Sequence, residues 1–161
     1  MMRAALTLMF AAFVVVAGGA FARGHADDGW DAIAAGDFAA AAAFWRPRAD
    51  HGDRGAMVGL GHLASLEGRD AEAARWYHRA AVRGDEVAQT LLASAYLEGR
   101  GVIRDPKLAY AWYHIAAEAG HARAAEARDL AGRWLSAAEQ AEARALARSW
   151  QLEGMPEAPR Q

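Results

Sequence analysis

The chain contains no cysteine, and several other residue types are scarce. Without a thiol the protein cannot have a disulfide framework, a thiol nucleophile, a zinc–cysteine site or a lipid anchor on cysteine. The 161 residues include only four prolines, four serines and one lysine, Lys107, whereas 44 are alanine. Alanine is the strongest helix former and is depleted in strands, so this composition favours helices.

Positive charge is not in excess either. Lysine and arginine number 18 and aspartate and glutamate 20, which gives a net charge of −2. Proteins that hold nucleic acid or anionic lipid electrostatically need clustered cations. We therefore expect no nucleic-acid partner.

The first 22 residues are organised like a secretory signal peptide. Arg3 supplies a positive start, residues 6–17 are mainly apolar, and Ala20-Phe21-Ala22 fits an A-x-A cleavage site. The apolar run is shorter than the roughly 20 residues of a membrane span, and two glycines follow it. We predict a cleaved signal peptide over 1–22 and a mature chain that starts at Arg23, is not stably inserted in a membrane, and is periplasmic or secreted.

An internal repeat organises the rest of the chain. Trp76-Tyr77-His78 recurs as Trp112-Tyr113-His114, and in both copies two alanines and then a glycine follow at the same spacing. A weaker copy begins at Phe44-Trp45. Apolar residues three and four apart within each copy indicate amphipathic helices, so every unit predicts a helical hairpin.

Helix signals divide the repeats into eight segments. Asp53, Asp85, Asp105 and Ser136 stand at expected N-cap positions, and glycines stand where helices must end. The predicted helices cover residues 29–35, 37–50, 53–67, 70–83, 85–98, 106–119, 121–133 and 136–152.

These segments predict an all-α fold, a short right-handed α-solenoid of stacked helical hairpins with a C-terminal capping helix. The repeat domain is expected over 23–153, and residues 154–161 are expected to be a disordered tail. Within the domain we place repeats at about 37–68, 70–99 and 106–133 and the cap at 136–152.

The sequence over residues 76–122 follows a specific pattern. A Trp-Tyr-x-x-Ala-Ala helix is followed by glycine, by a second helix with Tyr96, and by the loop Gly99-x-Gly-Val-x-x-Asp105. This pattern resembles the Sel-one-like repeat family, a branch of the tetratricopeptide-repeat superfamily. The resemblance implies an adaptor or assembly factor that binds another protein in a curved groove, and exported members are linked to envelope stress, secretion or toxin neutralisation.

The resemblance also suggests where a partner binds. By analogy with superfamily geometry, the helices at 53–67, 85–98 and 121–133 line a concave face. His78 and His114 occupy equivalent repeat positions and are expected to share a surface role on the opposite, convex face. The residues expected on the concave face are His62, Ser65, Thr90, Ser94 and Glu98.

Two alternatives to an adaptor stay open. One is an inhibitor or immunity protein that neutralises an envelope-acting toxin enzyme. The other is a cell-wall or β-lactam hydrolase. The resemblance implies the β-lactam substrate, since cysteine-rich members of the family are associated with β-lactam binding, and His62 and Ser65 are three residues apart and can share a helix face. The sequence has neither G-x-S-x-G nor S-x-x-K. We therefore expect no enzyme activity and no cofactor.

The mature N-terminus carries one further possibility. A chain beginning Arg23-Gly24-His25 offers an amine, two amide nitrogens and an imidazole. Four such nitrogens suit square-planar Cu(II) or Ni(II). The hypothesis is that His25 anchors such a site.

Overall fold

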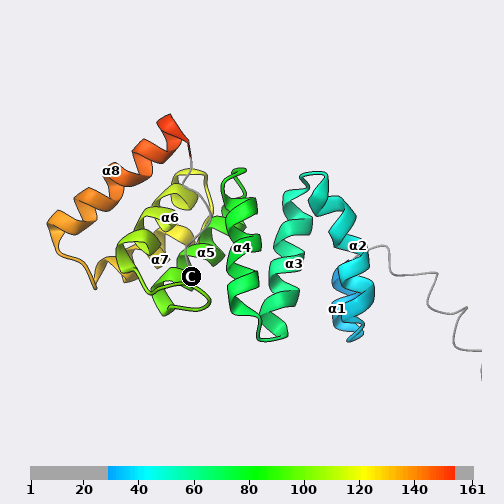
Figure 1. Cartoon of the computed structure of the whole chain (residues 1–161). Helices are drawn as coiled ribbons and strands as arrows, with labels where there is room; N and C mark the ends of the chain where they lie inside the picture. Colours follow the sequence, from blue (N-terminus) through cyan, green and yellow to red (C-terminus); the bar gives the residue numbers. More distant parts are fainter. Residues whose placement is uncertain (1–28, 155–161) are drawn as a thin grey trace, which may run out of the picture.

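The computed structural model describes residues 29–154, and these residues form eight α-helices and no strand. The helices are α1 (Gly29–Ala34), α2 (Phe38–Asp50), α3 (Arg54–Leu66), α4 (Asp70–Ala81), α5 (Glu86–Glu98), α6 (Pro106–Glu118), α7 (Ala124–Gly132) and α8 (Ala137–Glu153). They follow one another in an array in which each helix packs on the next from α1 to α7 (Figure 1). The predicted all-α solenoid of stacked hairpins is confirmed.

The expected N-caps explain why the helices begin where they do. The Asp53 carboxylate accepts the backbone N–H of Ala56 at 3.0 Å, and the Asp85 carboxylate accepts that of Ala88 at 2.8 Å. At the last helix, Ser136 and Glu139 form a capping box. Each cap satisfies a backbone donor that has no partner inside its helix.

One predicted helix starts late. The sequence predicted a helix over 121–133, but α7 begins at Ala124. His121 stands where Asp53 and Asp85 stand in the earlier repeats, and its ring accepts no N–H from the next turn. Arg123 occupies the N-cap position without a side-chain hydrogen bond. The first turn of the expected helix is therefore lost.

Alanine and aromatic residues divide the core between them. Many alanines that face a neighbouring helix are completely buried, for example Ala41, Ala80 and Ala116. Large rings fill the spaces that these small residues leave, among them Trp45 and Trp112, which are 3% and 1% exposed. Burial of this apolar surface is the main source of stability in such an array.

The histidines of the repeat contradict one expectation. His78 is buried, with 5% exposure, and its ring meets the edge of Trp112. The side chain of His114 is only 14% exposed. The prediction of a shared role on an exposed convex face is wrong, because the His78 side chain is buried and only a small part of the His114 side chain is exposed.

The C-terminal helix caps the array in an unusual way. α8 packs along α6, while it has hardly any contact with α7, the helix that precedes it. Trp150 near its end lies against Trp112 of α6, with ring centroids 5.0 Å apart. The predicted capping helix is present, and it is held by α6.

Several predictions fall on parts of the chain that the structure does not describe. The signal peptide over 1–22, the possible metal site at Arg23-Gly24-His25 and almost all of the tail over 154–161 lie outside the described residues. Among the helices of residues 29–154, none is long and apolar enough to span a bilayer.

Candidate functional site

A groove of about 230 Å³ lies between α3 and α5, with α4 at its base. We call it the α3–α5 groove. Its lining residues are His62, Ser65, Asp70, Ala73, Ala74, Tyr77, Leu91, Ala95 and Arg100. Ligand sites of this kind combine a largely apolar wall with a few polar groups that fix orientation.

The base of the groove is formed by Tyr77 and small residues. Tyr77 is 7% exposed, and its ring lies against Gly61 of α3, where a Cβ would come within 2.4 Å of ring atom Cε1. Burial raises the pKa of Tyr77 to about 12. The hydroxyl is therefore neutral at physiological pH and keeps its proton as a hydrogen-bond donor.

One end of the groove is charged. Asp70 and Arg100 line this end, and their charges shift the Tyr77 pKa in opposite directions. Arg100 also forms an ion pair with Glu98, with Nε and Oε2 2.7 Å apart. Both partners of this pair are exposed, so the pair contributes little to stability and can open to meet a ligand.

An aromatic cluster lies beside the α3 wall of the groove. The imidazole of His62 lies 5.3 Å from the ring of Trp30 on α1, and Trp30 in turn meets the edge of Trp45 at 4.9 Å. Trp30 is 42% exposed although it belongs to this cluster. A partly exposed tryptophan beside a groove offers apolar area to a partner, as is usual at protein interfaces.

The five predicted site residues fall into two groups. His62 and Ser65 line the α3–α5 groove. Thr90, Ser94 and Glu98 are on α5 but outside that lining, since Leu91 and Ala95 are the α5 residues that face it. The structure therefore brings together two of the five residues and leaves the other three as a separate stripe.

The separate stripe is occupied by internal hydrogen bonds. The Thr90 hydroxyl donates to the Glu86 carbonyl at 2.9 Å and lies 3.4 Å from His121 Nδ1. The Ser94 hydroxyl donates to Glu98 Oε1 at 2.8 Å. A ligand at this stripe would have to replace these contacts, which makes it a weaker candidate than the groove.

The structure gives no positive sign of catalysis at the groove. His62 and Ser65 both line it, but their side chains form no hydrogen bond with each other, so the hydroxyl has no base to activate it. Within residues 29–154, no cluster of three or more His, Asp or Glu side chains could hold a metal ion.

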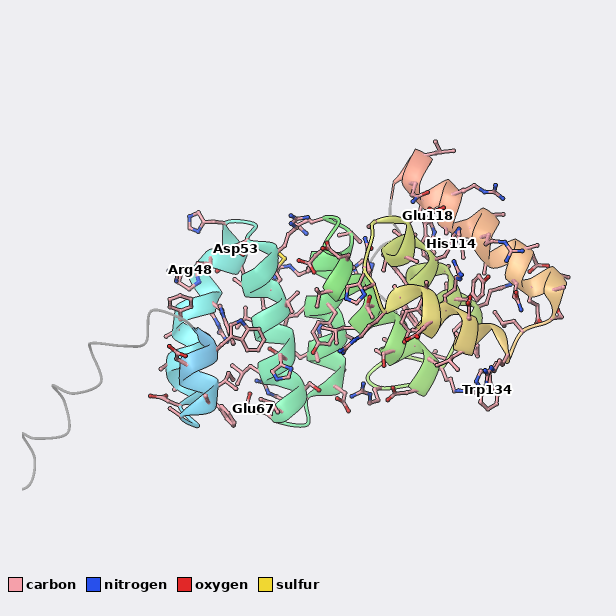
Figure 2. All side chains as sticks on the ribbon, turned by 180° about the vertical axis from the view of Figure 1, so that it is seen from behind. Arg48, Asp53, Glu67, His114, Glu118 and Trp134 are labelled. Carbon is pink, nitrogen blue, oxygen red and sulfur yellow. The ribbon has the colours of Figure 1, made fainter. Side chains whose placement is uncertain are left out.

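A second hollow of about 290 Å³ lies between α2, α3 and α4. Its charged residues include Glu67, labelled in Figure 2, and Arg69, which pairs with both Glu67 and Glu72. Because these charges neutralise one another, the α3–α5 groove remains the better candidate.

Sequence reasoning missed much of the groove lining. Ala73, Ala74, Leu91 and Ala95 follow the same helical period as the core, and apolar residues at core spacing do not reveal whether they face a neighbour or a groove. Arg100 lies in the loop after α5, and only the return of that loop toward α4 brings it to the groove. The one available signal was the repeat offset, which gives Tyr77 and Tyr113 equivalent positions in two successive repeats.

Two segments of the chain match a known repeat family, and its fold is similar to that of a solved structure. The Sel1 repeat matches residues 55–85 and 87–121. The structure is similar to the crystal structure of c5321, a protective antigen present in uropathogenic Escherichia coli strains that displays an SLR fold. The two share 29% sequence identity with a TM-score of 0.71 over 81% of this chain. The match spans 30% of the antigen's chain, and no curated protein matches this sequence.

The two matched repeats group the helices into pairs that differ from those of the ranges predicted from the sequence. They pair α3 with α4 and α5 with α6, whereas our ranges of 37–68, 70–99 and 106–133 pair the second helix of one unit with the first of the next. With this pairing, both matched repeats contribute helices to the α3–α5 groove.

Proposed function

Because two Sel1 repeats match residues 55–85 and 87–121, we propose that the protein belongs to the Sel1-repeat family and is an exported adaptor that binds a protein partner in the cell envelope. The Sel1 and SLR repeat fold is in general a scaffold for protein–protein interaction. The cell-envelope location rests on the signal-like sequence of residues 1–22.

The observation that carries the proposal is the α3–α5 groove. Its lining includes His62, whose ring lies against Trp30, the small residue Ala74 at the base, and the charged side chain of Arg100. An extended segment of a partner can place an apolar side chain on the base and a polar group at the charged end. Aromatic and arginine side chains are the types enriched at such interfaces.

Ser65→Arg is the variant that tests the proposal. Ser65 is half-buried at the wall of the groove, and arginine there would fill the space while remaining compatible with a helix. The tagged mature protein would be cross-linked in the envelope fraction of its source cells and the captured proteins identified by mass spectrometry. We expect one dominant partner that Ser65→Arg no longer captures.

The matched control is Ser149→Arg, the same change on α8. Helical content by circular dichroism should be equal in both variants. Capture of the same partner by Ser65→Arg would exclude the groove, and capture of no partner would contradict the adaptor role. If the captured partner is a toxic envelope enzyme whose activity falls on binding, the adaptor is an inhibitor.

A further inference from the structure

Exposed apolar side chains gather at one edge of the helical array. The connections after α1, α3, α5 and α7 lie at the same end of their helices, because successive helices turn back on one another (Figure 1). Figure 2 shows Glu67 of the second of these connections and Trp134 of the last along this edge. We call these four connections the connection edge. Each of them contains or adjoins an exposed large apolar residue: Phe38, Leu66, Ile103 and Trp134.

The connections at the opposite end of the helices differ. Those after α2, α4 and α6, all within the described residues, neither contain nor adjoin an exposed large apolar residue. At the connection edge, in contrast, Ile103 and Trp134 are 70% and 68% exposed. Apolar side chains are unfavourable in water, so their collection on one side of a protein marks a surface that meets another molecule or a membrane.

The loop that carries Ile103 is held in place on both sides of this residue. On one side Gly101 lies on the backbone at the start of α4, where a Cβ would come within 2.2 Å of the Asp70 carbonyl carbon. On the other side Arg104 Nε donates to the Leu97 carbonyl at 2.9 Å. The backbone therefore holds Ile103 at a fixed position at the edge, with its side chain in solvent.

Trp134 brings two arginines to the same place. The Cζ atom of Arg104 lies over the indole, 5.1 Å from the ring centroid, and Arg133 precedes Trp134 in the chain and is exposed. Among the described residues, no carboxylate forms an ion pair with Arg104 or Arg133. Arg69 and Arg100 at the same edge are each paired with glutamate. Two positive charges without a counter-ion therefore lie beside the most exposed apolar side chains of the edge.

This combination of side chains fits the surface of an anionic lipid bilayer. Tryptophan is enriched at the membrane–water interface, where its ring lies at the level of the headgroups. Arginine can keep its stem on apolar surface while its guanidinium meets headgroup phosphates, and an anionic surface attracts each such cation. Separate apolar side chains along one edge can enter a flat interface together, whereas a peptide segment is better held by a groove such as the one between α3 and α5.

We propose that the connection edge, centred on Ile103, Arg104, Arg133 and Trp134, docks the protein on the surface of an anionic lipid bilayer. The contact is peripheral, since only side chains of the edge enter the interface. The chain has a net charge of −2, so the attraction is local to this edge and needs the apolar side chains as well as the two arginines. The proposal does not use the α3–α5 groove and is tested separately from the adaptor role.

The probe for this surface is a suspension of vesicles of equimolar phosphatidylglycerol and phosphatidylcholine, sedimented with the mature protein. Low ionic strength is needed because salt screens exposed charges. We expect the protein to sediment with these vesicles and far less with vesicles of phosphatidylcholine alone. Trp134→Ala should lower the partition coefficient about tenfold through loss of an apolar side chain from the interface. Arg133→Gln should lower it about fivefold through loss of one cation.

Leu152→Ala on α8 and Arg75→Gln on α4 are the matched controls, since both residues are exposed and lie outside the connection edge. Both should bind vesicles as the unmodified protein does, and all variants should have equal helical content by circular dichroism. No binding to the anionic vesicles, equal binding to phosphatidylcholine alone, or equal weakening by a variant and its control would overturn the proposal. A benzophenone amino acid at Ile103 that cross-links a protein and no lipid in the envelope fraction would assign the edge to a protein partner and would also overturn it.

Discussion

The indole ring of Trp45 lies directly on the backbone of Gly59. A Cβ at Gly59 would come within 2.4 Å of Cε2 of the ring, and one at Gly29 of α1 would come within 2.3 Å of the same atom. One tryptophan of α2 therefore fills the space between α1 and α3, and glycine on both neighbours makes room for it. Tyr77 of α4 packs in a similar way on Gly61, which is also on α3.

Gly59→Ala should destabilise the protein. The added methyl group has no space, because Trp45 is 3% exposed and is held on two sides. Overpacking of a filled core costs about 1–3 kcal/mol of unfolding free energy. The loss would be measured by urea denaturation of the mature protein.

The control for this variant is Gly55→Ala in the same helix. A Cβ at Gly55 would meet only Asp53 Oδ1, at 3.4 Å. Alanine in place of an exposed helical glycine stabilises by about 0.5–1 kcal/mol. If the two variants changed stability in the same direction, the close packing of Trp45 on Gly59 would be refuted.

Trp150→Ala should release the capping helix. Trp150 is 9% exposed and lies on Trp112, and α8 has few contacts with α7 to compensate for its loss. Truncation of a buried tryptophan costs about 3–5 kcal/mol. Guanidinium denaturation followed by far-ultraviolet circular dichroism would measure it. Leu152→Ala, on the same helix but 86% exposed, should leave stability unchanged, and an equal loss there would contradict the assignment.

Acid should weaken the fold through His114. Burial lowers the pKa of this imidazole, and the charges of Arg128, Arg144 and Arg148 lower it further, while Glu118 opposes them. The unfolded chain then takes up a proton near pH 6.5, where folded His114 is still neutral. Stability from this group is complete above about pH 6.5 and falls as the pH drops toward the lowered value.

The unfolding free energy, measured between pH 7.5 and 5, checks this expectation. His114→Gln should flatten the decline with falling pH, whereas His51→Gln, at an exposed position after α2, should preserve it. A decline that is equally steep in both variants would assign the acid sensitivity to other groups.

The N-terminus offers a prediction from sequence alone. Intact-mass measurement of the protein from its source cells should give a chain that begins at Arg23, and a chain that still begins at Met1 would refute cleavage. Copper titration of the mature protein should then produce a visible absorption band that His25→Ala abolishes. The lack of a band would refute the metal site.

The helices of this protein were predictable because their signals are local. Asp85 caps α5 and Ser136 begins α8 through contacts three residues away. α7 shows the limit of that reasoning, since repeat symmetry suggested a start at His121 that its side chain cannot cap. The start of α7 is therefore set by the missing side-chain cap and not by the symmetry of the repeat.

The site was only partly predictable because it depends on how helices meet. His62 and Ser65, two of the five predicted residues, line the α3–α5 groove, while Leu91 and Arg100 of the same lining were missed. Nothing in the sequence indicates that α8 packs along α6 and has little contact with α7. Such relationships arise from tertiary register and not from helical period.

The most direct test of the account is photo-crosslinking from the groove. A benzophenone amino acid at Leu91, which lines the α3–α5 groove, would be compared with one at Arg79, which lies outside that lining and stacks on Trp76. Both proteins would be irradiated in the envelope fraction. The account predicts a single cross-linked partner from Leu91 that is absent from Arg79. Equal cross-linking from both positions, or cross-linking from Arg79 alone, would contradict the groove as the binding surface.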